Sequence, residues 1–152
     1  MDMPQPTDAH RRLEPLVGHW TGTETVAPHP GDPEGATAQA DVRNRASLGG
    51  FIVVQDYVQS RGGEVHFGGH GVFSHDGQKY QLHWWDLMGS PPDIFSGDFE
   101  GDVLKLQSAT AMGHARCSFD LSQSDGYAFT MEMSQDGKDW FAFMQGAYAR
   151  AD

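Results

Sequence analysis

One carboxylate stands out among the residues that could do chemistry inside an otherwise apolar sheet. Asp86 follows Trp84 at a spacing of two in a strand-like stretch, so both side chains point to the same face. A carboxylate on an inner face must be hydrogen-bonded or paired, because burying an isolated charge is costly. Asp86 could therefore bind a ligand hydroxyl group or act as a general base. An equally good interpretation is that it caps a backbone turn near Gly89.

The candidate ligand-binding residues are side chains that the predicted strands turn to the same inner face. Aromatic and methionine side chains are typical of the walls of an apolar ligand site, and a few polar groups orient the ligand. The same residues could instead pack into a filled core, as small barrels do. The candidates are Asn44, Gln55, Tyr57, Phe67, Phe73, Tyr80, Trp84, Asp86, Met88, Phe119, Phe129, Met131 and Met144.

The histidines do not have the spacing of a metal site. His66 and His70 would bind one zinc ion on a helix, but the surrounding glycines predict a strand, on which they lie roughly 13 Å apart. His70 and His83 are closer across a hairpin, yet the sequence offers no obvious third ligand. We therefore expect no metal ion. Cys117 is interpreted as a small buried hydrophobe beside Phe119.

Short segments of strand length, separated by glycine-rich turns, predict an all-β fold of nine or ten antiparallel strands in a meander. Residues 27–35 contain three prolines and two glycines, so they predict a long loop at the mouth of a barrel. Thr7 precedes helix-forming residues and predicts one short helix over residues 7–17. We expect residues 1–6 to be disordered and residues 1–152 to form a single domain.

Pairing across the turns predicts a register for each hairpin. For the strand that follows Arg61, the three-residue turn Arg61-Gly62-Gly63 is preferred over Gly62-Gly63, because it turns Phe67 and Trp84 inward and a one-residue slip would invert every side chain. The predicted pairs are Asn44 with Gln55, Val42 with Tyr57, Phe99 with Leu104, Gly97 with Leu106, Phe73 with Tyr80, His70 with His83, Phe119 with Met131 and Phe129 with Met144.

The two ends of the chain are predicted to meet and close the sheet into a barrel. Gly18 and Trp20 open the first strand, which runs to about Val26, and Arg150 ends the last strand on its inner side. A guanidinium group over an indole face makes a favourable cation–π pair. We therefore expect structural roles for Gly18, Trp20 and Arg150 at one end of the barrel.

The bulk composition excludes several classes of partner. The chain has 152 residues and a net charge of −11, which repels phosphate backbones and anionic lipids, so we expect no nucleic-acid and no membrane partner. One cysteine excludes an internal disulfide, and the N-terminal stretch lacks the pattern of a secretion signal. These observations favour a cytoplasmic protein. The oligomeric state stays open, with a homodimer as one option.

Several motifs follow one another along most of the chain. They are Leu16-Val17-Gly18-His19-Trp20-Thr21-Gly22, Leu48-Gly49-Gly50, Val54-Gln55-Asp56-Tyr57, Trp84-x-Asp86-x-Met88-Gly89, the Asp136-Gly137 hairpin and Tyr148-x-Arg150. In these motifs the chain resembles the DUF1579 family of small bacterial proteins, although Phe51 stands where that family commonly has Arg. The resemblance implies a calycin-like (lipocalin-like) antiparallel barrel, whose relatives mostly bind small hydrophobic molecules in the interior.

The resemblance also suggests haem as a cofactor to consider, because the related nitrobindin barrels carry a haem group on a histidine of a late strand. The last histidine here is His114, and the last two strands offer only Met133 and Met144, so haem is disfavoured and no cofactor is expected. The common enzyme signatures are absent. The sequence therefore favours binding of a small, largely apolar molecule. Two alternatives stay open: an enzyme that uses the same cavity for proton transfer, cyclisation or isomerisation, and a filled barrel that acts through its surface.

Overall fold

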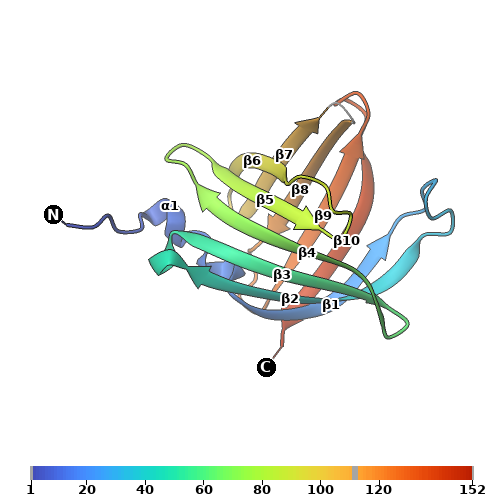
Figure 1. The fold of residues 1–152 in the computed structure, drawn as a ribbon, viewed down its shortest axis with the longest axis horizontal. Coiled ribbons are helices and arrows are strands. Elements are labelled where there is room, and N and C mark those ends of the chain that lie inside the picture. Colours follow the sequence, from blue (N-terminus) through green and yellow to red (C-terminus); the bar gives the residue numbers. More distant parts are fainter. Residues whose placement is uncertain (1, 111–112, 152) are drawn as a thin grey trace.

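The computed structural model describes residues 2–110 and 113–151, most of which lie in ten strands (Figure 1). Apolar and polar residues alternate along these strands, so that one face of each strand turns inward and the other meets solvent. In this described part, no helix has the length and apolar character needed to cross a membrane. The elements are α1 Asp8–Arg11, η1 Glu14–Leu16, β1 Gly18–Val26, β2 Ala36–Ser47, η2 Leu48–Gly50, β3 Ile52–Arg61, β4 Glu64–His75, β5 Tyr80–Asp86, β6 Asp93–Glu100, β7 Val103–Thr110, β8 Gly113–Asp120, β9 Gly126–Ser134 and β10 Phe141–Arg150.

The strands form one closed antiparallel barrel, which confirms the predicted meander and its closure by the first and last strands. Trp20 and Arg150 are direct partners across this seam, and the Arg150 guanidinium carbon lies 4.2 Å from the centre of the Trp20 ring. The indole N–H of Trp20 donates to the carbonyl oxygen of Leu16 at 2.9 Å. Gly18 has a φ of +150°, and a Cβ atom there would lie 2.6 Å from Nη1 of Arg150. This position therefore favours glycine.

The N-terminal segment fills one end of the barrel. Residues 7–17, predicted as one helix, contain α1 and the 3₁₀ turn η1, and Leu16 at the end of η1 is fully buried. The hydroxyl group of Tyr80 donates to the carbonyl oxygen of Ala9 at 2.6 Å, which ties β5 to the end of the barrel at α1. Figure 1 shows α1 at this end and the loop of residues 27–35 at the other.

Two hairpins have the predicted register. Asn44 pairs with Gln55 and Val42 with Tyr57 between β2 and β3. Between β6 and β7, Gly97 pairs with Leu106. Both hairpins have short turns built on adjacent glycine or aspartate residues, for which sequence spacing fixes the register.

Three other hairpins differ from the predicted register, by two residues in the β4–β5 and β8–β9 pairs and, beyond the bulge in β10, in the β9–β10 pair. In the turn between β4 and β5, the Asp76 carboxylate accepts hydrogen bonds from the N–H groups of Gln78 and Lys79 and thereby holds a four-residue turn instead of a two-residue one. The β8–β9 connection is also longer than predicted, and β10 contains a bulge. A shift of two residues leaves each side chain on its predicted face. The corrected pairs are Phe73 with Leu82, His70 with Trp85, Phe119 with Phe129, and Gly146 with Phe129.

The turn before β4 differs from the prediction, although the faces of β4 do not. β3 and β4 join through the two-residue turn Gly62-Gly63, whose φ angles of +59° and +83° suit glycine. By itself, this turn would point Phe67 outward. The register shifts between Gln59 and Ser60, so Phe67 lies opposite Gln59 and both side chains border the interior. This β-bulge reverses the effect of the two-residue turn. The side chains of β4 therefore point to the faces that were predicted from the three-residue turn.

Candidate ligand cavity

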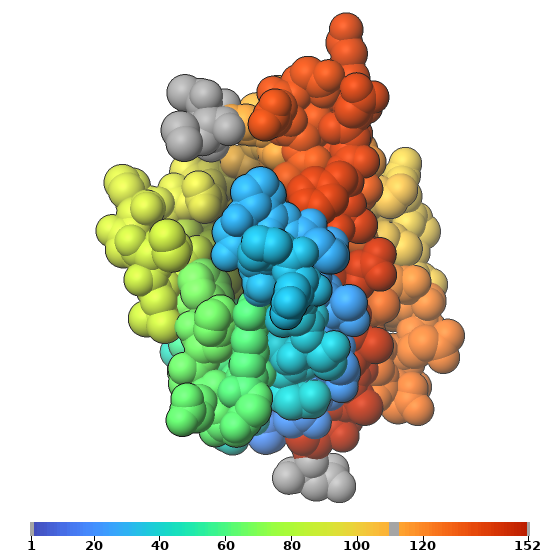
Figure 2. Space-filling view, turned by 90° about the vertical axis from the view of Figure 1, so that its right-hand side faces the viewer, coloured from blue at the N-terminus to red at the C-terminus, as the bar shows by residue number. Residues whose placement is uncertain are grey.

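The end of the barrel away from α1 holds a cavity of about 670 Å³. Figure 2 looks onto this end, where residues 27–35 (blue) stand between the turn at residues 62–64 (green) and the C-terminal strands (orange to red). His29 and Asp32 from this loop line the cavity, together with side chains from the surrounding strands. Its volume lies within the range of about 300–1,000 Å³ that is typical of small-molecule sites.

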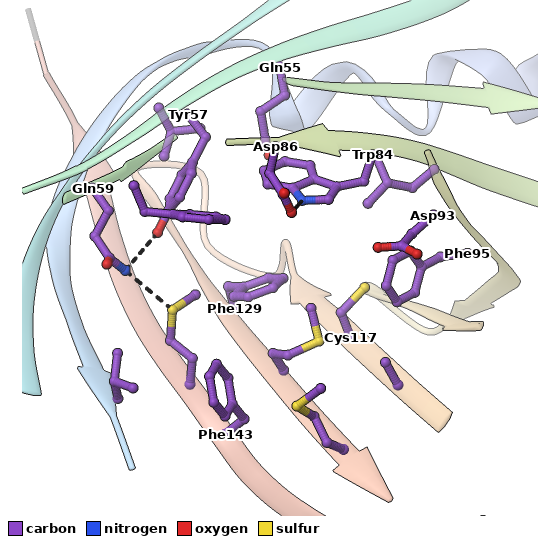
Figure 3. Close-up of a pocket in the computed structure, with 18 of the residues that line it drawn as sticks. Gln55, Tyr57, Gln59, Trp84, Asp86, Asp93, Phe95, Cys117, Phe129 and Phe143 are labelled. Atoms are coloured by element: carbon purple, nitrogen blue, oxygen red, sulfur yellow. Dashed lines mark hydrogen bonds between the residues drawn. The ribbon is translucent and has the colours of Figure 1, made fainter. Parts of the chain in front are cut away.

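The cavity brings together most of the residues that the sequence proposes for a ligand site. They come from strands that are distant in the sequence and share the inner face of the closed sheet, and Figure 3 shows several of them around the open space. The proposed residues that line the cavity are Gln55, Tyr57, Phe67, Trp84, Asp86, Phe119, Phe129, Met131 and Met144.

Four proposed residues do not line the cavity. Asn44, Phe73 and Tyr80 point inward but are buried toward the closed end. There the amide nitrogen of Asn44 donates to the Leu16 carbonyl oxygen at 2.9 Å. Met88 is 77% exposed, so the prediction that it points into the barrel is wrong. β5 ends at Asp86, and the turn that follows breaks the alternation on which that prediction rested.

A buried carboxyl group behind the cavity wall was missed by the sequence analysis. Glu24 is 0% exposed and accepts hydrogen bonds from the hydroxyl groups of Tyr57 at 2.5 Å and Tyr148 at 2.6 Å, and from the amide nitrogen of Gln59 at 3.0 Å. Tyr57, Tyr148 and Gln59 all border the cavity. Glu24 thereby fixes three of the side chains that shape its polar wall. The signal was available, because Glu24 lies four residues after Trp20 on the same face of β1.

Burial raises the pKa of Tyr57, Tyr80, Tyr127 and Tyr148 above the ordinary value of 10.0, and the charge of Glu24 raises those of Tyr57 and Tyr148 further. The unfolded chain therefore loses phenolic protons above about pH 10 that the folded barrel retains. The free energy of unfolding is unaffected by these tyrosines below that pH and falls above it, by about 1.4 kcal/mol per pH unit for each tyrosine that stays protonated in the folded barrel.

We expect an alkaline titration to show tyrosinate absorbance rising together with loss of the far-ultraviolet circular dichroism of the sheet. The chain in concentrated guanidinium chloride serves as the reference for unperturbed tyrosines. Tyrosinate that forms near pH 10 while the dichroism of the barrel stays constant would contradict the buried positions of these side chains.

Trp84 and Asp86 form one unit in the cavity wall. The indole N–H of Trp84 donates to Oδ2 of Asp86 at 3.0 Å, and the backbone N–H of Met88 donates to Oδ1 at 3.0 Å. Asp86 therefore faces the cavity and also holds the turn after β5, which confirms the turn-capping interpretation, while its role toward a ligand stays a prediction. The Trp84 ring lies directly on the backbone of β4, because Gly69 and Gly71 carry no side chain beneath it.

Gly69→Ala is expected to push the Trp84 ring toward the cavity and weaken ligand binding, because the added Cβ atom would lie 2.1 Å from a ring carbon of Trp84. Gly68→Ala is the matched control on the same strand, since its added Cβ would meet no side-chain atom closer than 3.6 Å. The measurement is the tryptophan emission spectrum together with the affinity for an apolar fluorophore. Equal spectra and affinities for the two variants would contradict this placement of Trp84.

An ion pair stands at the mouth of the cavity. Nη1 of Arg61, at the end of β3, lies 2.9 Å from the Asp32 carboxylate in the loop of residues 27–35. The ring of His29 in the same loop lies 4.8 Å from that of Phe143 on β10. These contacts hold the loop against two strands that border the cavity. The sequence predicts this loop at the mouth of the barrel but gives no signal for the residues that it contacts.

Cys117 lines the cavity at 4% exposure, opposite Met131 on the next strand. Burial raises the pKa of its thiol to about 12, so the group remains protonated at neutral pH. A protonated thiol is a weak nucleophile. Cys117 therefore contributes to the apolar wall.

Two of the described histidines line this cavity. Among the described residues, His29 and His66 line it, whereas His114 lies outside it with its ring 6.3 Å from that of Trp140. In the same described part, no group of three His, Cys, Asp or Glu side chains could hold a metal ion. Among the described residues of β8, β9 and β10, no histidine lines the cavity.

Comparisons with known proteins agree with this architecture. A search of curated protein sequences found no match. The crystal structure of Rv2717c from M. tuberculosis is similar with a TM-score of 0.74 and 17% identity over 96% of this chain and 99% of that one. The S-type phycobiliprotein lyase CPES from Guillardia theta is similar with a TM-score of 0.60 and 12% identity over 97% and 99% of the two chains. At these identities, the likeness concerns the fold alone. The model of the family described as "Protein of unknown function (DUF1579)" matches residues 5–150, and the chain therefore belongs to the DUF1579 family.

Proposed function

We propose that this barrel binds a small, largely apolar molecule in the cavity at its open end. The observation that carries the proposal is a space of about 670 Å³ with aromatic rings and methionine side chains in its wall. Methionine side chains adapt to ligands of different shape, and aromatic rings supply a large contact area. The amide groups of Gln55 and Gln59 reach the same space and can orient a ligand by hydrogen bonds.

A filled barrel that acts through its surface has less support. Phe73, Leu104 and Leu106 are at most 1% exposed and fill the interior where they lie. Phe129 and Met131 also point inward but border the cavity and are only half-buried. Because one part of this barrel is tightly packed, the unfilled space in the other part favours a ligand cavity over an incompletely packed core.

A binding role for Asp86 has more support than a catalytic one. Both of its carboxylate oxygens already accept hydrogen bonds from Trp84 and Met88, which hold the group in place. One structural neighbour is named as a lyase, but at 12% identity it supports the shared fold and no shared reaction.

The test of this proposal is a titration with the neutral fluorophore N-phenyl-1-naphthylamine, followed by its displacement with decanol. Ala115→Phe places a ring in the cavity and is expected to lower the affinity for the fluorophore by about tenfold or more. Ala128→Phe is the matched control, because Ala128 is exposed on β9. Equal affinities for the wild type and both variants would overturn the proposal.

Met131→Ala is expected to lower the free energy of unfolding by about 1 kcal/mol or less, because it enlarges an existing cavity and opens no new one. Leu106→Ala is the matched comparison, since Leu106 is 1% exposed and lies outside the cavity wall. That substitution should cost about 2–5 kcal/mol. Urea unfolding of both variants measures the difference, and equal costs would favour a filled barrel.

A further inference from the structure

The side chains that line the cavity carry more negative than positive charge. Among the described residues that line it, Asp32, Asp86 and Asp93 carry carboxylates and Arg61 carries the guanidinium group. Arg61 and Asp32 form an ion pair at 2.9 Å and so compensate each other. In the described part of the chain, Asp86 and Asp93 have no ion-pair partner, and Asp93 is exposed at the start of β6. Asp93 also borders a second pocket that contains the titratable side chains of His114, Asp136 and Asp139. His29 and His66 are the histidines that line the cavity itself.

These two carboxylates lie on either side of Trp84. Asp86 follows it by two residues on β5, and Asp93 is its direct partner on β6. Figure 3 shows both carboxylates turned toward the open centre of the cavity, with Phe129 across from them. The hydrogen-bond donors of Asp86 are a neutral indole and a backbone N–H. Neither donor removes the negative charge that the cavity presents.

Aromatic faces stand next to the same carboxylates. The rings of Tyr57 and Trp84 lie 5.9 Å apart and are tilted by 59° to each other. Phe95 on β6 also lines the cavity, two residues after Asp93. Aromatic faces attract cations, and the attraction grows where water is excluded. The net charge of −11 on the whole chain adds a field of the same sign.

We propose that the preferred ligand is an apolar cation, a molecule with a protonated amine or quaternary ammonium group on an apolar body. The cationic group lies between Asp86 and Asp93 against Trp84, and the apolar body lies along Phe129 and Met131. A ligand with a carboxylate head is disfavoured, because it would meet two like charges while the guanidinium group at the mouth is already paired. This inference rests on the proposed binding function and specifies its ligand class.

The experiment compares decylamine, decanol and decanoate, which share one alkyl chain, as competitors of N-phenyl-1-naphthylamine at neutral pH and below their micelle concentrations. We expect decylamine to bind about tenfold more tightly than decanol, and decanoate to bind more weakly than both. Asp86→Asn and Asp93→Asn should each weaken decylamine severalfold more than they weaken decanol. Asp98→Asn is the control, because Asp98 lies on the same strand as Asp93 and is equally classed as exposed but is absent from the cavity wall.

The outcomes separate the two proposals. If decanol does not bind, the proposed function itself fails. If decanol binds and decylamine binds no more tightly, binding stands and the cationic ligand class is overturned. The same holds if Asp98→Asn weakens decylamine as much as Asp86→Asn and Asp93→Asn do, because the preference would then come from the overall charge.

Discussion

Trp20→Ala is expected to lower the free energy of unfolding by about 3–5 kcal/mol. Trp20 is 1% exposed at the seam between β1 and β10, and its ring packs edge-on against Tyr127 at 5.0 Å. The substitution leaves a hole at the closed end and removes the ring beneath the guanidinium group of Arg150. It also removes the donor to the Leu16 carbonyl oxygen, which ties η1 to the barrel. Urea unfolding monitored by circular dichroism measures the loss.

Trp85→Ala is the matched control for this prediction. Trp85 is 40% exposed, and its neighbours are the rings of His70 and His83. Because it fills no buried space, its removal should cost less than about 1 kcal/mol. Similar costs for the two tryptophans would contradict the closure of the barrel at Trp20.

Glu24→Leu is expected to lower the free energy of unfolding by about 2–6 kcal/mol. The substitution keeps the volume but leaves the hydroxyl groups of Tyr57 and Tyr148 without their acceptor. Each buried donor that loses its partner costs about 1–3 kcal/mol. Since both tyrosines border the cavity, the affinity for an apolar ligand should fall as well.

A triple variant distinguishes this network from simple packing. Tyr57→Phe and Tyr148→Phe remove the two donors, so adding them to Glu24→Leu should recover part of the lost stability, because removing both partners of a buried hydrogen bond is nearly neutral. If the triple variant is less stable than Glu24→Leu alone, the three groups do not act as a hydrogen-bonded unit.

The closure and the strand faces could be predicted from the sequence because both depend on local rules. Alternation fixes the face of a residue within a strand, and the residues Trp20 and Arg150 identify the strands that meet. The predicted strand register was wrong where a turn was longer than its Asp-Gly pair implied. An example is the turn at Asp76, whose carboxylate holds a four-residue turn. Since these errors were of two residues, they left Phe73 on its predicted inner face.

The sequence predicted which side chains of the candidate site point inward, but not which of them border the cavity and which lie in the packed core. Phe73 and Trp84 both point inward, yet Phe73 lies in packed core and Trp84 borders the cavity. What separates them is how far the N-terminal segment fills the barrel, which depends on tertiary packing and not on strand periodicity. The same limit applies to Arg61 and Asp32, because no local rule predicts which strand a long loop contacts.

The most direct measurement is a crystal structure of the protein grown with decanol. We expect density for the alcohol inside the barrel, between Trp84 and Met131, with its hydroxyl group toward the polar wall. Density confined to the outer face, for instance at the exposed side chains of Trp85 and Ile94, or an interior closed by repacked side chains, would contradict the account.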